Sequence, residues 1–186
     1  MAKLILKEFR CVVDTDESGD ESPYFVTWVG NLVTAETAVK RSRRAFWENK
    51  VSPGPTWPVN DTVVSGFDLN PSHTLALALM IEEDEGTDLT KAEAETDVKA
   101  RMFEIFENYR QGGFQVNDPL FISTMRNSLR AAVLDKMRPG VGADDDIMEE
   151  DDYRAARVIP LPGHVGAMEV TFKGGNGKYV ARYHHE

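Results

Sequence analysis

Carboxylate side chains gather in three short runs of this 186-residue chain. The run DTDESGDE at residues 14–21 holds five acids, EEDEGTD at 82–88 holds five, and residues 144–152 hold seven. Side chains of like charge repel one another, so a hard cation neutralises such a run or water solvates it. Carboxylate oxygens are the ligands that Ca²⁺ prefers in proteins. The first question is therefore whether any run has the spacing of a calcium loop.

The run at 14–21 has the spacing of half a calcium loop. Asp14, Asp16 and Ser18 alternate as oxygen donors, and Gly19 permits a sharp turn. In a helix–loop–helix site a bidentate glutamate would stand at position 25, but Phe25 occupies it. That kind of site is excluded. The remaining ligands must come from another loop, and we expect 82–88 to supply them if both loops leave the same end of a sheet.

The predicted ligands of this calcium site are therefore side chains from both loops. They are Asp14, Asp16, Ser18, Asp20, Glu21, Glu82, Asp84 and Asp88. The alternative is that no metal binds, water solvates both loops, and their charge keeps the acidic protein soluble. We interpret the third run, within an acidic loop at 143–153, as a solvated or disordered segment.

A family resemblance supports the calcium hypothesis. The pattern Asp16-x-x-Gly19-x-x-x-Pro23-Tyr24, placed after an apolar strand and before FVTW, resembles the first calcium loop of C-two-type domains, which are calcium-dependent lipid-binding modules. The stretch LALMIEEDEGTD is similar to their third loop. The resemblance covers residues of about 3–33 and 73–88, and it implies an antiparallel β-sandwich with Ca²⁺ at the loop tips.

The chain also departs from the pattern of that family. Ser22 stands where those domains have an aspartate directly before Pro-Tyr. In the third loop Glu82 and Asp84 take the pair positions and Asp88 the third, so one glutamate replaces the usual aspartate. The helical segment 88–138 has no counterpart in the family fold. These differences weaken the implication of lipid binding more than they weaken the implication of a β-sandwich fold.

The remaining elements are mostly strands. Alternating or β-branched apolar residues predict strands, some joined by turns such as GGNG at 174–177, at residues 3–13, 23–33, 62–69, 73–81, 157–161, 164–172 and 178–185. Residues 34–50 fit a short helix or a strand with a basic face, and both remain open. The proline-rich stretch 52–58 is expected to be an irregular crossing loop.

Two helices interrupt the strands. Thr90 and Glu93 form a capping box, and Asp118 followed by Pro119 is a second helix start. Apolar stripes follow each start at Ala94, Val98, Met102, Ile105 and Tyr109, and then at Ile122, Met125, Leu129, Val133 and Met137. We therefore expect a single domain over residues 1–186. Its fold class is mainly β (α+β), an antiparallel β-sandwich with an inserted helical pair at about 88–138.

Charge and composition narrow the function. The net charge of −10 argues against a nucleic-acid partner. No metal-binding set of cysteines and histidines, phosphate loop or nucleophile elbow occurs, so we expect no enzyme. The single cysteine, Cys11, lies in an apolar strand and is read as buried. No signal peptide or membrane span is recognised, which predicts a soluble protein, cytoplasmic or exported without a leader.

Three function classes remain from the sequence. The first is a calcium-binding interaction module that docks on a protein, a glycan or an anionic membrane surface. The second is a structural or assembly subunit, for which a homo-oligomer is open, and the third is an acidic inhibitor or immunity-type protein without a metal. The one basic cluster, Lys40, Arg41, Arg43 and Arg44, fits anionic headgroups, an acidic partner or the chain's own acids.

Overall fold

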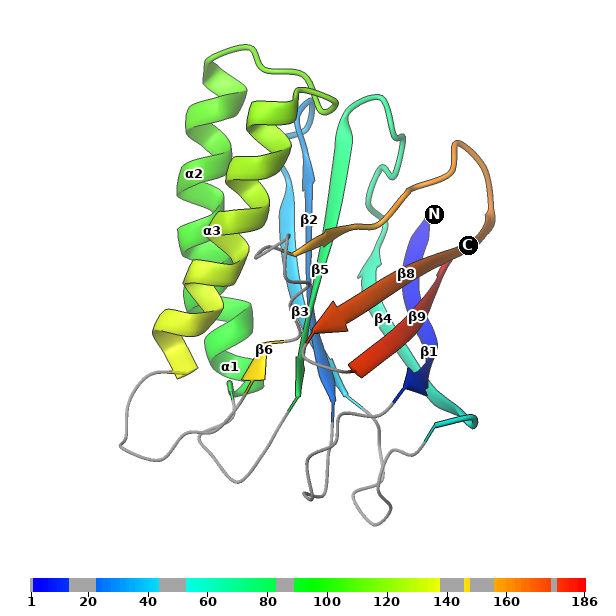
Figure 1. Cartoon of the computed structure of the whole chain (residues 1–186). Helices are drawn as coiled ribbons and strands as arrows, with labels where there is room; N and C mark the ends of the chain where they lie inside the picture. Colours follow the sequence, from blue (N-terminus) through cyan, green and yellow to red (C-terminus); the bar gives the residue numbers. More distant parts are fainter. Residues whose placement is uncertain are drawn as a thin grey trace.

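The computed structural model describes residues 2–13, 23–43, 53–82, 89–137, 146–147, 156–174 and 177–186. Two antiparallel sheets face each other, and a pair of helices covers the outer face of one of them (Figure 1). The predicted fold class is confirmed: a mainly β sandwich with an inserted helical pair.

The four-stranded sheet, here called sheet A, has the strand order β4-β1-β9-β8. Its strands are β1 (Lys3–Val13), β4 (Thr56–Ser65), β8 (Gly166–Gly174) and β9 (Gly177–His185). The two ends of the chain meet here, because the backbones of Lys3 and Glu186 exchange hydrogen bonds of 2.7 and 2.9 Å. Against β4, strand β1 shifts register twice.

The second sheet, sheet B, has the order β3-β2-β5-β6, with β7 also paired to β5. Its strands are β2 (Tyr24–Asn31), β3 (Thr37–Arg43), β5 (Thr74–Glu82), β6 (Asp146–Ile147) and β7 (Arg157–Val158). The sequence of residues 34–50 fits a helix or a strand, and the structure shows a strand, β3, over residues 37–43.

Two predicted boundaries around β4 are wrong. The strand begins at Thr56 and runs through Pro58, so the irregular segment does not extend to residue 58. It ends at Ser65, so residues 66–69 are not strand as predicted. The physical reason is the edge position of β4, since an edge strand can carry a proline without losing a ladder hydrogen bond.

The inserted helices begin where the sequence predicts. One continuous helix comprises α1 (Lys91–Glu93), the π-helical turn η1 (Ala94–Val98) and α2 (Lys99–Gln111), followed by α3 (Pro119–Met137). The Thr90 hydroxyl accepts from the Glu93 amide at 3.2 Å, and the Glu93 carboxylate accepts from the Thr90 amide at 2.8 Å. The Asp118 carboxylate accepts from the amide of Leu120 at 2.8 Å. Both caps are thus confirmed.

The core has two layers separated by sheet B. Between the sheets lie aromatic side chains such as Phe9, Phe25 and Phe172, together with Cys11, which is fully buried as predicted. Between sheet B and the helices lie Trp28, Phe106 and Phe121, together with the predicted stripe residues Ala94, Val98, Met102, Met125, Leu129 and Val133. Every residue of β2 is buried, because this strand is covered on both faces.

Candidate functional site

The strand ends that flank the acidic runs lie at one end of the sandwich, which we call the loop end. Strand β2 begins at Tyr24, directly opposite Ile81 near the end of β5. The next residue, Glu82, pairs with Asp146 of β6. Strands β1 and β5 both end at the bottom of Figure 1, the end at which β2 begins. Segments 14–22 and 83–88 are therefore covalently attached to neighbouring strand ends, about 4.8 Å apart in a sheet.

Most of the predicted ligands lie outside the described residues. Of the eight, Asp14, Asp16, Ser18, Asp20, Glu21, Asp84 and Asp88 fall in segments 14–22 and 83–88. Glu82 is the last residue of β5, and its backbone is described. Within the described ranges, no group of three or more His, Cys, Asp or Glu side chains is arranged to hold a metal ion.

The pairing of Glu82 with Asp146 adds a third acidic run to the loop end. The acidic sequence of residues 143–153 predicts a solvated or disordered loop. Two residues of it, 146–147, form β6 against β5, and the others lie outside the described residues. Antiparallel pairing with β5 is a long-range contact that no local pattern in the acidic run indicates.

The basic cluster is divided between two faces of β3. Lys40 forms an ion pair with Asp61 of β4 at 3.4 Å, which joins the edges of the two sheets. Arg41 lies over the ring of Tyr24, 4.4 Å from its centroid, on the face covered by the helices. Arg44 lies outside the described residues. For Lys40 the structure favours pairing with the chain's own acids.

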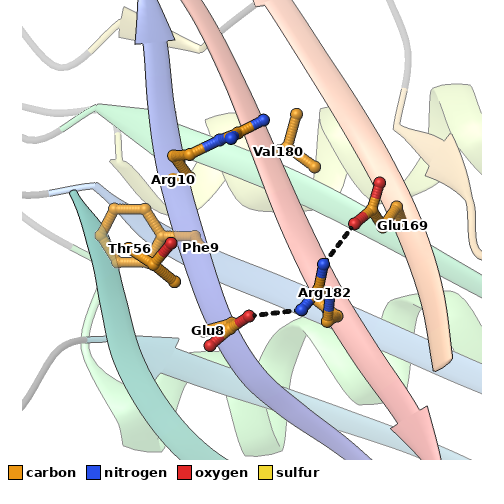
Figure 2. Close-up of a pocket in the computed structure, with 7 residues that line it drawn as sticks. All are labelled: Glu8, Phe9, Arg10, Thr56, Glu169, Val180 and Arg182. Atoms are coloured by element: carbon orange, nitrogen blue, oxygen red, sulfur yellow. Dashed lines mark hydrogen bonds and ion pairs between the residues drawn. The ribbon is translucent and has the colours of Figure 1, made fainter. Parts of the chain in front are cut away.

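A second polar feature is a shallow hollow on the outer face of sheet A, which no described helix covers (Figure 1). It measures about 100 Å³ and is lined by Glu8, Phe9, Arg10, Thr56, Glu169, Val180 and Arg182. In Figure 2, Arg182 reaches from β9 to a carboxylate on each neighbouring strand, at 2.9 Å to Glu8 and 2.8 Å to Glu169. The hydrogen bond to Glu169 and the charge of Glu8 raise the pKa of Arg182.

The Arg182 guanidinium binds two carboxylates in this hollow, one on each neighbouring strand. The group therefore functions as a clamp across three strands. Sequence reasoning missed it, because Glu8, Glu169 and Arg182 stand side by side only through the registers Glu8↔Arg182 and Glu169↔Arg182. A pairing register is not encoded in the spacing of one segment.

The opposite end of the sandwich carries a histidine–carboxylate pair. His73 Nε2 lies 2.6 Å from an oxygen of Asp68, and this hydrogen bond lowers the pKa of Asp68. The second oxygen of Asp68 accepts from the amide of Asn70 at 3.0 Å. Both interactions close the turn that leads into β5. The pair therefore has a structural explanation in the turn.

Comparisons with protein-family models, curated proteins and solved structures found no match to this chain. Among the described helices, none is both long and apolar enough to cross a membrane.

Proposed function

We propose that this protein is a calcium-binding β-sandwich module whose acidic segments hold Ca²⁺ and form a docking surface for a partner. One observation supports this more than any other: Tyr24 pairs with Ile81, and Glu82 pairs with Asp146. Three acidic runs are thereby anchored to adjacent positions of one sheet end. The sequence hypothesis required such an arrangement of the strands that flank its two loops.

The charge of these runs gives the physical reason for a cation. More than half of the 31 acidic residues of the chain lie in the three runs. Anchoring them to neighbouring strands concentrates negative charge, which raises the repulsion between them. A divalent ion bound by six to eight oxygens removes this repulsion and joins the runs. The proposed ligands are Asp14, Asp16, Ser18, Asp20, Glu21, Glu82, Asp84 and Asp88.

The docking surface is part of the same proposal. An ion that joins two loops also fixes their shape, so binding of a protein, glycan or anionic membrane would depend on calcium. The resemblance to C-two-type domains supports this assignment through the Asp16–Tyr24 pattern. In vesicle co-sedimentation with and without calcium, a pellet that depends on both calcium and anionic lipid identifies the membrane as the partner.

Isothermal titration of the full chain with CaCl₂ at physiological salt tests the metal site. We expect heat of binding and a higher melting temperature, since an ion that binds only the folded state stabilises by about 2.7 kcal/mol at 100 times its Kd. The double variant Asp16→Asn with Asp84→Asn should lose both effects.

The matched control is Glu104→Gln, which removes a carboxylate from an exposed position of α2. This variant should bind calcium as the unmodified chain does. An unmodified chain that shows neither heat nor a change in melting temperature would rule out the calcium site.

A further inference from the structure

The outer strands of the two sheets differ in how their free edges are protected. An unprotected edge strand presents backbone N–H and C=O groups that can pair with another chain. Strand β4 carries Pro58 and two register shifts against β1, features that block edge pairing. Strand β3 contacts β4, η1 and α2. On the far side of β5, strands β6 and β7 each occupy part of the edge.

Among the described residues, strand β8 contacts β7 of sheet B but lacks the proline and the register shifts of β4. It is nine residues long, contains no proline and pairs with β9 without a register shift from Gly166 to Gly174. Among the described residues β9 is its one strand partner, and β8 forms the outer strand of sheet A in Figure 1. Its side chains alternate strictly: Met168, Val170 and Phe172 are buried, whereas Ala167, Glu169, Thr171 and Lys173 are exposed.

The hairpin geometry determines which backbone groups of β8 point to the free edge. Gly174 and Gly177 pair across a two-residue connection. In hairpins of this length the flanking residues form a hydrogen-bonded pair, and such pairs alternate along the ladder. Residues 170, 172 and 174 therefore bond to β9. The N–H and C=O groups of Glu169, Thr171 and Lys173 point away from β9.

We propose that β8 pairs antiparallel with β8 of a second copy of this chain, about a twofold axis at Thr171. The four-stranded sheets of the two copies then form one continuous sheet. In this register Glu169 faces the partner subunit's Lys173, and the twofold axis repeats the same pair. Thr171 faces the partner subunit's Thr171, a cross-strand threonine pair of a kind that stabilises sheets.

Charge selects this register over the two that are shifted toward the start of β8. With the axis at Val170, Glu169 would face threonine and Lys173 would face alanine, so no ion pair forms between the two copies. With the axis at Glu169, two carboxylates would face each other and repel. Two identical strands meeting edge to edge give a closed, isologous dimer. The centre at Thr171 also lies away from the crossover segment 159–165, which joins β8 at Gly166.

The clamp described above supports this arrangement. Arg182 holds the Glu169 carboxylate on the outer face of sheet A at 2.8 Å, at the position where the partner subunit's Lys173 would arrive. Exposed ion pairs contribute little to the affinity of the dimer, so their role here is to favour one register over the others. The affinity comes from about six backbone hydrogen bonds and from extension of the sheet.

Sedimentation velocity of the full chain over a range of concentrations tests the dimer. We expect a monomer–dimer equilibrium that is the same with calcium and with a chelator, so that the result is independent of the calcium proposal. Thr171→Pro removes one N–H at the free edge and leaves the ladder to β9 intact. This variant should abolish the dimer. Circular dichroism and the melting temperature then check that the variant is still folded.

Charge reversal provides a test that does not depend on the proline variant. Glu169→Lys and Lys173→Glu alone each place like charges opposite one another twice, and each should raise the dimer Kd about tenfold or more. An equimolar mixture of the two variants should form a heterodimer, because both pairs are then complementary. Glu104→Lys on α2 is the matched control and should dimerise normally. A monomeric unmodified chain, or a mixture that stays monomeric, would overturn the proposal.

Discussion

The hydroxyl groups of Tyr183 and Thr27 lie 3.0 Å apart in the middle of the sandwich, where both side chains are fully buried. Tyr183 belongs to β9 of sheet A and Thr27 to β2 of sheet B, so this hydrogen bond joins the two sheets through an otherwise apolar layer. Burial raises the pKa of Tyr183, which keeps its hydroxyl protonated. The bond fixes how the sheets, and hence their strand ends, are aligned.

Removal of one partner of this bond should be costly. Tyr183→Phe leaves the Thr27 hydroxyl buried without a partner, and Thr27→Val does the same to Tyr183. Each is expected to reduce the free energy of unfolding by about 1–3 kcal/mol in urea denaturation. The double variant should cost less than the sum of the two, since no polar group is then left unpaired. Strictly additive losses would contradict a bond between the sheets.

Gly30 of β2 allows the helices to approach sheet B. A Cβ at this position would lie 2.5 Å from Cζ2 of Trp28 and 3.0 Å from Cε2 of Phe106, two rings that pack edge to face at 5.5 Å. Gly30→Ala should therefore destabilise the fold by about 1–3 kcal/mol through overpacking. Its matched control is Gly163→Ala, where an added Cβ meets nothing within 4 Å. Thermal unfolding should separate the two variants clearly; equal melting temperatures would show that the helices do not rely on this close approach.

The capping box predicts a dependence of stability on pH. Hydrogen bonds from the Thr90 hydroxyl and amide lower the pKa of Glu93 below the ordinary glutamate value of 4.5. The ionised carboxylate thus stabilises the folded state above pH 4.5, and this contribution is lost as the pH falls through the lowered folded value. Glu93→Gln should be less stable than the unmodified chain at neutral pH, with the difference shrinking below pH 4.5.

Chemical denaturation at a series of pH values measures this difference, with Glu104→Gln as the control for loss of a carboxylate elsewhere on the helix. The control should show no comparable difference at any pH. A gap between Glu93→Gln and the unmodified chain that is constant across the acid range would mean that the cap does not need its charge.

Local signals predicted the helices and most of the strands. The caps at Thr90 and Asp118 need only residues three or four positions away, so sequence sufficed for them. Strand β3 was ambiguous because Lys40, Arg41 and Arg43 give it no clear apolar face; one of these cations pairs with Asp61 and another lies on Tyr24.

Features that depend on pairing between distant segments were not predicted. The pairing of β6 with β5 and the Arg182 clamp arise only when strands far apart in sequence become neighbours. The buried aromatic contact between Phe106 and Phe121, at 6.3 Å, falls outside both predicted stripes for a related reason. Two helices that pack on each other and on a sheet bury a wider surface than a single stripe. The proposed calcium ligands remain predictions from the residue spacing.

The backbone pairing of Lys3 with Glu186 has a practical consequence for work with this molecule. Strand β1 runs from that pairing to Val13 at the loop end. A tag on either terminus is therefore attached near the end of sheet A that lies opposite the loop end. Immobilisation through the first or last residue would thus leave the loop end, with Val13 of β1, directed away from the support. The same proximity would permit a circularly permuted gene, since a short linker could join the old ends and new ones could be opened at an exposed turn such as that around Gly163.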